Sequence, residues 1–232
     1  MELLRGARGV VRVGHRGAAA LAPENSLAAI EAAAAYGVDA VELDVLRGLV
    51  VAHGPEVPAG APLLDEALAL VAALGLAVQV DVKVRGLETG VVEALRRHAL
   101  IDRSFVSSFS LPILVAFAAV EPRLPRAFTY PEDRLGLTGS RVLGPATRPA
   151  LAALRALLPR RLPRWLRAAG ASAATLNWAV VTPEAIEVCH RRGVAVYAWT
   201  VNEPVLAITL VESGIDGIIS DDPRIFPAGI DS

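Results

Sequence analysis

Short apolar segments alternate with longer segments rich in alanine and leucine along the whole chain, and this alternation restricts the fold more than any other feature. The short segments have the length and composition of buried β-strands, whereas the longer ones have helical length. Eight segments are predicted as strands: 10–14, 40–45, 76–82, 104–109, 127–130, 173–176, 194–199 and 216–220. Strands that alternate with helices pair in parallel. We therefore expect a (β/α)8 TIM barrel, an α/β fold that usually takes roughly 250 residues.

The predicted helices carry end signals that fit this alternation. Three of them cover residues 25–36, 64–74 and 87–98. Asn25 or Ser26 can cap the first helix, and Thr182 can cap a later one that has Pro183 at its first position. An open doubly wound sheet is the alternative, but polar residues close so many strands that a barrel mouth explains them better. Without a linker or low-complexity tract, residues 1–232 are expected to form a single domain.

The composition indicates a cytoplasmic protein. Hydrophobic residues make up 53 % of the 232 residues, but no apolar run is long enough to span a bilayer. The N-terminal residues lack the uninterrupted apolar core of a signal peptide. The only cysteine, Cys189, excludes an intrachain disulfide and fits a reducing compartment. The net charge of −1 argues against a partner that is a nucleic acid.

Polar residues stand where several of the predicted strands end. The first three strands contribute six of them: His15, Arg16, Glu42, Asp44, Asp81 and Lys83. Residues two apart in a strand point to the same face. Glu42 and Asp44 therefore share one face of the second strand, and Asp81 and Lys83 share one face of the third. The seventh strand ends at Trp199. Because residues at the C-terminal strand ends of a barrel line its active site, we expect these side chains to meet there.

Three of these residues form a candidate metal site. Glu42, Asp44 and Asp81 would repel one another strongly inside a barrel mouth, so a cation is expected between them. Hard oxygen ligands without thiolates favour one Ca²⁺ or Mg²⁺ ion over zinc.

Two cations point to a phosphate. Arg16 can bind two phosphate oxygens at once, and Lys83, the only lysine of the chain, adds a compact charge. The alternatives are a surface salt bridge for Arg16 and simple neutralisation of Asp81 by Lys83.

Two histidines complete the candidate site. Segment 45–53 reads as a hairpin that carries His53 back to Asp44. A pair such as His15 and His53 suits phosphodiester cleavage, because one imidazole takes a proton from the attacking oxygen and the other gives one to the leaving oxygen. A structural role is the alternative for either histidine alone.

The stretch 131–172 is the least regular part of the chain and contains several arginines. It could form a basic lid that meets a phosphorylated substrate or a membrane surface. The simpler interpretation, which we favour, is a surface helix with a solvated face.

Together these residues resemble the glycerophosphodiester phosphodiesterase family. The matching motifs are His15-Arg16-Gly17, Pro23-Glu24-Asn25-Ser26, Glu42-Leu43-Asp44-Val45, His53, residues 62–68, Asp81-Val82-Lys83, Ser107-Ser108-Phe109, residues 196–202 and residues 214–223. The resemblance covers nearly the whole chain, and it is the ordered set of motifs that is specific. It implies a metal-dependent enzyme that hydrolyses glycerophosphodiesters, which are small molecules, to glycerol 3-phosphate and an alcohol.

The resemblance also implies a role for each residue of the site. It assigns acid/base catalysis to His15 and His53, metal binding to Glu42, Asp44 and Asp81, phosphate binding to Arg16 and Lys83, and the pocket wall to Trp199. In the implied mechanism a glycerol hydroxyl attacks the phosphorus, the alcohol leaves, and water opens the cyclic phosphate. A related phosphodiesterase that acts on lysophospholipids, with transient membrane contact, and a non-catalytic phosphate-binding barrel are the alternatives.

The chain departs from the family pattern at three places. The third metal position is Asp81 where glutamate is usual, so the ligand is one methylene shorter. Gly54 replaces the acid that usually follows the second histidine, so another group must orient His53. The segment 53–64 is brief, which predicts that the small subdomain inserted over the mouth in this family is reduced or absent.

Overall fold

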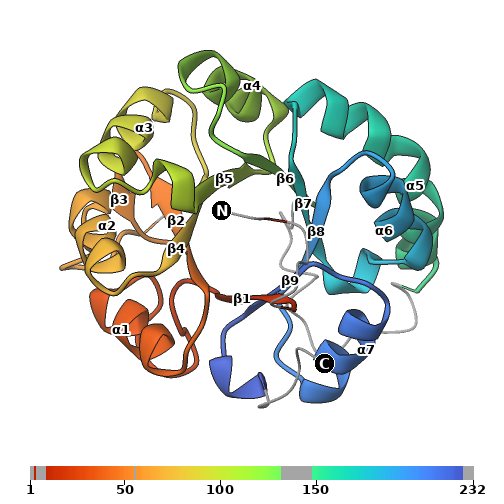
Figure 1. Ribbon diagram of the computed structural model, residues 1–232, viewed down its shortest axis with the longest axis horizontal. Coiled ribbons are helices and arrows are strands. Elements are labelled where there is room, and N and C mark those ends of the chain that lie inside the picture. Colours follow the sequence, from red (N-terminus) through yellow and green to blue (C-terminus); the bar gives the residue numbers. More distant parts are fainter. Residues whose placement is uncertain (1–2, 4–8, 55, 132–147, 227–232) are drawn as a thin grey trace.

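The structure, a computed structural model, describes residues 3, 9–54, 56–131 and 148–226. In this part of the chain, eight parallel strands form a closed barrel that is surrounded by helices (Figure 1). The barrel strands are β1 (Val11–Gly14), β2 (Ala40–Leu46), β4 (Ala77–Val82), β5 (Ser104–Ser108), β6 (Arg126–Tyr130), β7 (Ala173–Asn177), β8 (Ala195–Trp199) and β9 (Gly217–Ser220). The predicted (β/α)8 barrel is therefore confirmed.

The barrel closes because β1 pairs in parallel with both β2 and β9, the strands next to it and at the far end of the chain. A short ninth strand, β3 (Val50–Val51), pairs antiparallel with β2 through Val45 and Val51. This pairing confirms the predicted hairpin.

Helices connect successive strands on the outside of the barrel. They are α1 (Leu27–Ala35), α2 (Leu64–Ala73), α3 (Glu88–Arg97), α4 (Leu111–Val120), α5 (Arg148–Ala169), α6 (Pro183–His190) and α7 (Pro204–Glu212), with short 3₁₀ turns η1 (Ile101–Arg103), η2 (Trp178–Val180) and η3 (Pro223–Ile225). Ser26 and Thr182 cap α1 and α6 through their side-chain oxygens, as predicted. None of the described helices combines the length and the apolar character that a membrane span requires.

Apolar side chains fill the interior of the barrel toward the end where most of its strands begin. Val13, Phe105, Ala127, Tyr197 and Ile219 belong to one buried cluster inside the barrel. The Tyr197 hydroxyl donates a hydrogen bond to the carbonyl oxygen of Leu3, 3.0 Å away, so the buried phenol is satisfied. Apolar side chains thus fill this end, and the polar side chains collect at the other.

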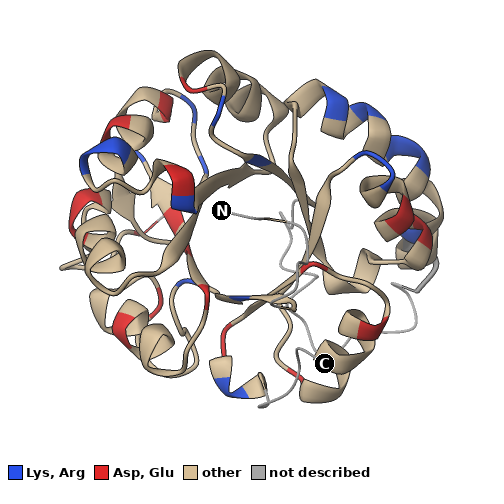
Figure 2. Ribbon diagram, in the orientation of Figure 1, with Lys and Arg blue, Asp and Glu red and all other residues tan. Residues whose placement is uncertain are grey.

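Helix α5 lies within the stretch 131–172, of which residues 132–147 fall outside the described part. Leu158, Leu162 and Leu166 bury one side of this helix against the barrel. Its charged residues are all arginines (Figure 2), and Arg160, Arg161 and others are exposed. The favoured interpretation of a surface helix with a solvated face fits this arrangement.

Candidate active site

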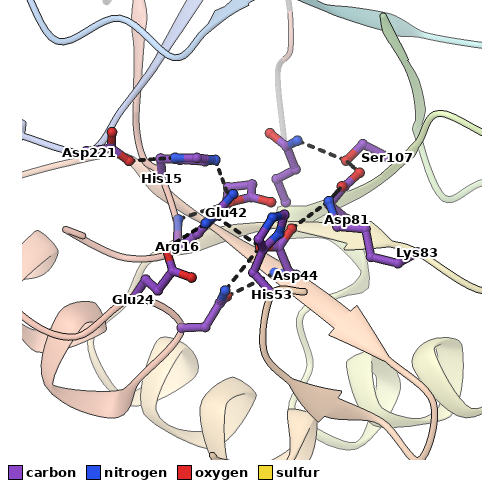
Figure 3. Close-up of polar contacts among 12 residues, drawn as sticks. His15, Arg16, Glu24, Glu42, Asp44, His53, Asp81, Lys83, Ser107 and Asp221 are labelled. Atoms are coloured by element: carbon purple, nitrogen blue, oxygen red, sulfur yellow. Dashed lines mark hydrogen bonds and ion pairs between the residues drawn. The ribbon is translucent and has the colours of Figure 1, made fainter. Parts of the chain in front are cut away.

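A cavity of about 1240 Å³ opens where the barrel strands end. Its lining includes every residue predicted for the site: His15, Arg16, Glu42, Asp44, His53, Asp81, Lys83 and Trp199. Figure 3 shows all of these except Trp199, gathered around the ends of β1, β2 and β4.

The three predicted metal ligands form one cluster. Asp44 and Asp81 are paired in register on neighbouring strands, and Glu42 lies two residues before Asp44 on the same face of β2. All three side chains are buried, and one oxygen of each lies within 4.8 Å of the others. Three hard, anionic oxygens at this spacing form a donor set that fits Ca²⁺ or Mg²⁺.

Two cations neutralise part of this cluster. Lys83 Nζ lies 2.6 Å from Asp44 Oδ1 and also contacts Asp81. Arg16 Nε forms an ion pair with Asp44 Oδ2 at 3.1 Å, and the backbone N–H of Arg16 donates to Glu42 Oε2 at 3.0 Å. The cluster therefore holds three carboxylates against two basic side chains.

Two basic side chains do not balance three carboxylates, and Glu42 is the carboxylate whose ionisation is most disfavoured. Its burial, with the charge of Asp44 beside it, raises the pKa of Glu42 to about 7. Asp44 behaves in the opposite way: although burial opposes ionisation, the charge of Lys83, the hydrogen bond to His53 and the charge of Arg16 hold the pKa of Asp44 well below the usual value. A cation bound at the cluster would favour the ionised form of Glu42.

Each histidine is held by a carboxylate through its Nδ1 atom. His15 Nδ1 lies 2.6 Å from Asp221 Oδ1, and His53 Nδ1 lies 3.1 Å from Asp44 Oδ2. An ionised carboxylate only accepts hydrogen bonds, so each neutral imidazole keeps its proton on Nδ1 and presents Nε2 for proton exchange. Asp44 thus supplies the orientation that Gly54 cannot give to His53.

Asp221 is itself fixed in place by Asn202. Asn202 Nδ2 donates to Asp221 Oδ2 at 2.7 Å, and the Asp221 backbone N–H donates to Asn202 Oδ1 at 3.0 Å. Burial lowers the pKa of His15, but the hydrogen bond to Asp221 and the charge of Glu42 outweigh it, so that the pKa is raised.

The loop between β1 and α1 positions Arg16 and Asp44. Gly17 has φ +85°, and a Cβ atom there would lie 2.6 Å from the backbone of Ala29, so only glycine fits. Asn25, also at positive φ, donates from Nδ2 to Asp44 Oδ2 and accepts the Asp44 backbone N–H, both at 3.0 Å. The sequence offered Asn25 or Ser26 as the cap of this helix; Ser26 is the residue that caps α1, and Asn25 holds a metal-ligand candidate.

Aromatic side chains line another part of the cavity. Trp199 donates from Nε1 to the carbonyl oxygen of Thr175 at 3.1 Å and meets the Phe109 ring edge to face, at 6.0 Å between centroids. Lys83 Nζ lies 5.5 Å from the centre of the Phe109 ring. Tyr130 and Trp165 form a further aromatic pair in the lining. The charged half of the cavity is therefore bordered by an apolar half.

Sequence reasoning missed the roles of four polar residues: Asn25, Gln79, Ser107 and Asp221. Ser107 Oγ donates to Asp81 Oδ1 at 2.6 Å, and Gln79 donates to Ser107. Gln79 lies two residues before a predicted ligand on the same face of β4, and Ser107 and Asp221 lie at strand ends, so position was the available signal for these three. Asn25 lies in the loop before α1, where its sequence signal is that of a helix cap.

The family of the chain follows from comparison with known proteins. The sequence model of the glycerophosphoryl diester phosphodiesterase family matches residues 15–55 and 78–225. The chain belongs to this family. The matched ranges contain all eight predicted site residues, and the predicted assignment to a family of phosphodiester hydrolases is confirmed.

Members of this phosphodiesterase family align with the chain over most of its length and of their own. A glycerophosphodiester phosphodiesterase of Caldanaerobacter subterraneus subsp. tengcongensis is 24 % identical, over 91 % of this chain and 94 % of the relative. The crystal structure of a glycerophosphodiester phosphodiesterase from Parabacteroides distasonis is similar with a TM-score of 0.73 at 18 % identity, covering 94 % of this chain and 95 % of the other. An Oleispira antarctica phosphodiesterase, solved in complex with the product sn-glycerol-3-phosphate, has a TM-score of 0.72 at 22 % identity, covering 93 % and 94 %. The two structural similarities establish the barrel fold alone.

Proposed function

We propose that this chain hydrolyses glycerophosphodiesters to glycerol 3-phosphate and an alcohol by acid/base catalysis with two histidines. The observation that carries the proposal is the pair of imidazoles, each held at Nδ1 by a carboxylate, at the border of a buried three-carboxylate cluster. The bound product of the Oleispira antarctica relative supports the choice of substrate class. A barrel that only binds phosphate would not need two oriented imidazoles.

Glu42, Asp44 and Asp81 are the residues that would hold one divalent cation, Ca²⁺ or Mg²⁺. This donor set consists of hard oxygens only, as these ions prefer. When bound, the cation neutralises charge on the phosphate and lowers the pKa of the attacking hydroxyl. Asn25 keeps Asp44 in place, and Ser107 fixes Asp81 in the same way.

Arg16 and Lys83 bind the phosphate group in this proposal. Lys83 carries three N–H donors, of which Asp44 and Asp81 take two, so one remains for a phosphate oxygen. Arg16 is anchored by Glu24, 2.5 Å from its Nη1 atom, and lines the same cavity. Because carboxylates already hold both cations in place, Arg16 and Lys83 can orient the phosphate before the reaction with little rearrangement of their own side chains.

His15 and His53 move the protons through their Nε2 atoms. One imidazole takes the proton from a glycerol hydroxyl as its oxygen attacks the phosphorus, and the other gives a proton to the departing alcohol oxygen. Water then opens the cyclic phosphate with the two roles reversed. The carboxylates at Nδ1 keep each ring in one tautomer and stabilise the imidazolium form.

A second candidate substrate class is the lysophospholipids. Tyr130 and Trp165 give the cavity an aromatic wall beside the charged cluster, and such a wall can contact an acyl chain. If the inserted subdomain expected of the family is reduced or absent in segment 53–64, the mouth would be more open, and this would relax the choice of alcohol.

We further propose that residues 1–232 act as one domain in the cytoplasm. Cys189 is buried, and its burial raises the pKa of the thiol to about 12, which keeps it protonated and unreactive. A single inert thiol suits a reducing compartment.

The test is a turnover assay with glycerophosphocholine and lysophosphatidylcholine, each with EDTA and with added Ca²⁺ or Mg²⁺. We expect cation-dependent release of glycerol 3-phosphate from the first substrate. Faster cleavage of lysophosphatidylcholine would favour the second candidate class, and no turnover of either substrate with any divalent cation would contradict the proposal.

A further inference from the structure

A chain of hydrogen bonds runs from the carboxylate cluster to Gln79. Gln79 lies on β4, two residues before Asp81, and only 3 % of its surface is exposed. Its Nε2 atom donates to Ser107 Oγ at 2.9 Å, and Ser107 Oγ donates to Asp81 Oδ1 at 2.6 Å. The three side chains thus form one buried relay at the cavity wall.

The relay fixes which end of the Gln79 amide points away from Ser107. An ionised Asp81 can only accept, so the single hydroxyl proton of Ser107 goes to it. Ser107 Oγ must then accept its second hydrogen bond, and only the NH₂ end of Gln79 can donate one. The network therefore determines the orientation of the Gln79 amide.

This orientation leaves a hydrogen-bond acceptor without a partner. Gln79 Oε1 is buried and makes no hydrogen bond with any of the described residues, although Gln79 lines the cavity. A buried acceptor without a partner is unfavourable, so a donor supplied by a ligand would be bound there with a gain in free energy.

Its position points to the inner end of the substrate. Gln79 is in register with Glu42 on one side and with Phe105 on the other, one layer deeper in the barrel than the pair Asp44 and Asp81. Lys83 contacts Asp81 Oδ2, whereas the relay ends on Asp81 Oδ1, so the ammonium and the relay use different oxygens of this carboxylate.

We propose that Gln79 Oε1 is a recognition site for a hydroxyl group, and that it accepts a hydrogen bond from the C1 hydroxyl of the substrate's glycerol. This inference rests on the proposed function, in which the C2 hydroxyl attacks phosphorus and the C1 hydroxyl stays free to donate. Gln79 is then a residue that selects glycerol over shorter or deoxygenated diols.

The experiment compares two substrates that differ only in this hydroxyl. They are glycerophosphocholine and the choline phosphodiester of propane-1,2-diol of matching configuration, which keeps the attacking hydroxyl. The wild-type protein should prefer the glycerol substrate in kcat/KM by about tenfold or more, because a hydrogen bond to a buried acceptor is lost with the analogue. Gln79→Met, which keeps the volume but has no amide oxygen, should reduce this preference to about twofold or less.

Thr129→Val is the matched control. Thr129 lines the same cavity and accepts a hydrogen bond from Thr175 Oγ1 at 2.7 Å, so the variant removes a different buried oxygen. It should keep the preference for the glycerol substrate. Equal kcat/KM for the two substrates in the wild-type protein, or an undiminished preference in Gln79→Met, would overturn the inference. The comparison of the two substrates with the wild-type protein does not depend on whether a variant folds.

Calorimetry separates this inference from the proposed function. In the presence of Mg²⁺, the wild-type protein should bind glycerol 3-phosphate about tenfold more tightly than propane-1,2-diol 1-phosphate, whether or not it turns over a diester. Absence of turnover with this binding preference intact would contradict the proposed function alone. If Gln79→Met instead weakens Mg²⁺ or Ca²⁺ binding and leaves the ligand preference unchanged, the amide oxygen is a metal ligand and the inference is wrong.

Discussion

Replacing Glu42 by glutamine should stabilise the metal-free protein at pH 8 much more than at pH 5. The folded-state pKa of Glu42 is raised from 4.5 to about 7, by burial first and by the charge of Asp44 second. With a raised pKa, the carboxyl group favours folding below pH 4.5, and this contribution is lost as the pH rises through 7. Glutamine has nearly the same shape as glutamate and never ionises, so the variant avoids the cost of a buried negative charge at high pH.

The magnitude follows from the pKa difference. Each unit corresponds to about 1.4 kcal/mol, so ionisation of Glu42 weakens the folded state by about 2.5 kcal/mol more at pH 8 than at pH 5. For a chain of this size, that difference corresponds to about 5 to 10 °C in Tm. Thermal unfolding of the wild-type protein and Glu42→Gln, in EDTA at both pH values, measures it.

Glu93→Gln provides the control, because Glu93 lies exposed on α3 and its substitution should shift Tm equally at the two pH values. A cation should raise the Tm of the wild-type protein at pH 8 and have a smaller effect on Glu42→Gln, which lacks one ligand. If Glu42→Gln shifts Tm by the same amount at pH 5 and pH 8, the electrostatic description of the cluster is wrong.

Four further changes test other parts of the site. EDTA should abolish turnover and Ca²⁺ or Mg²⁺ restore it, and Asp81→Glu, which recreates the ligand usual in the family, should stay active; full activity after exhaustive chelation would exclude the metal site. Acylation of Lys83, the only lysine, should reduce turnover in step with its modification by peptide mass spectrometry, and turnover that survives complete modification would leave the phosphate to Arg16. Asn25→Ala should lower the free energy of unfolding in urea by about 1 to 3 kcal/mol, since buried groups of Asp44 lose their partners, and an unchanged midpoint would contradict this role.

Most of the fold could be predicted because its determinants are local. Strands such as 40–46 and 195–199 are short apolar runs, and caps such as Thr182 mark the helix starts. The placement of Asp44 and Asp81 beside each other also followed from the sequence, since residues at the ends of parallel strands share one edge.

The partners that orient the site could not be predicted in the same way. His15 and Asp221 are 206 residues apart in sequence and meet only because β1 pairs with β9 as the barrel closes. Asn25 carries the signal of a helix cap, and its bond to Asp44 depends on the positive φ of the loop before α1. The free acceptor on Gln79 depends on the direction of two hydrogen bonds, which residue types alone do not specify.

The most direct test of the proposed catalysis is the rate of glycerol 3-phosphate formation from glycerophosphocholine by the wild-type protein, His15→Ala and His53→Ala, with saturating Ca²⁺ or Mg²⁺. Circular dichroism should first establish that each variant is folded. We expect cation-dependent turnover by the wild-type protein and a decrease in turnover rate of about 10²- to 10⁴-fold in each variant, the range typical for loss of a general acid or base. Near-normal turnover in either folded variant would contradict the acid/base role of that histidine, and in both variants it would refute the two-histidine mechanism.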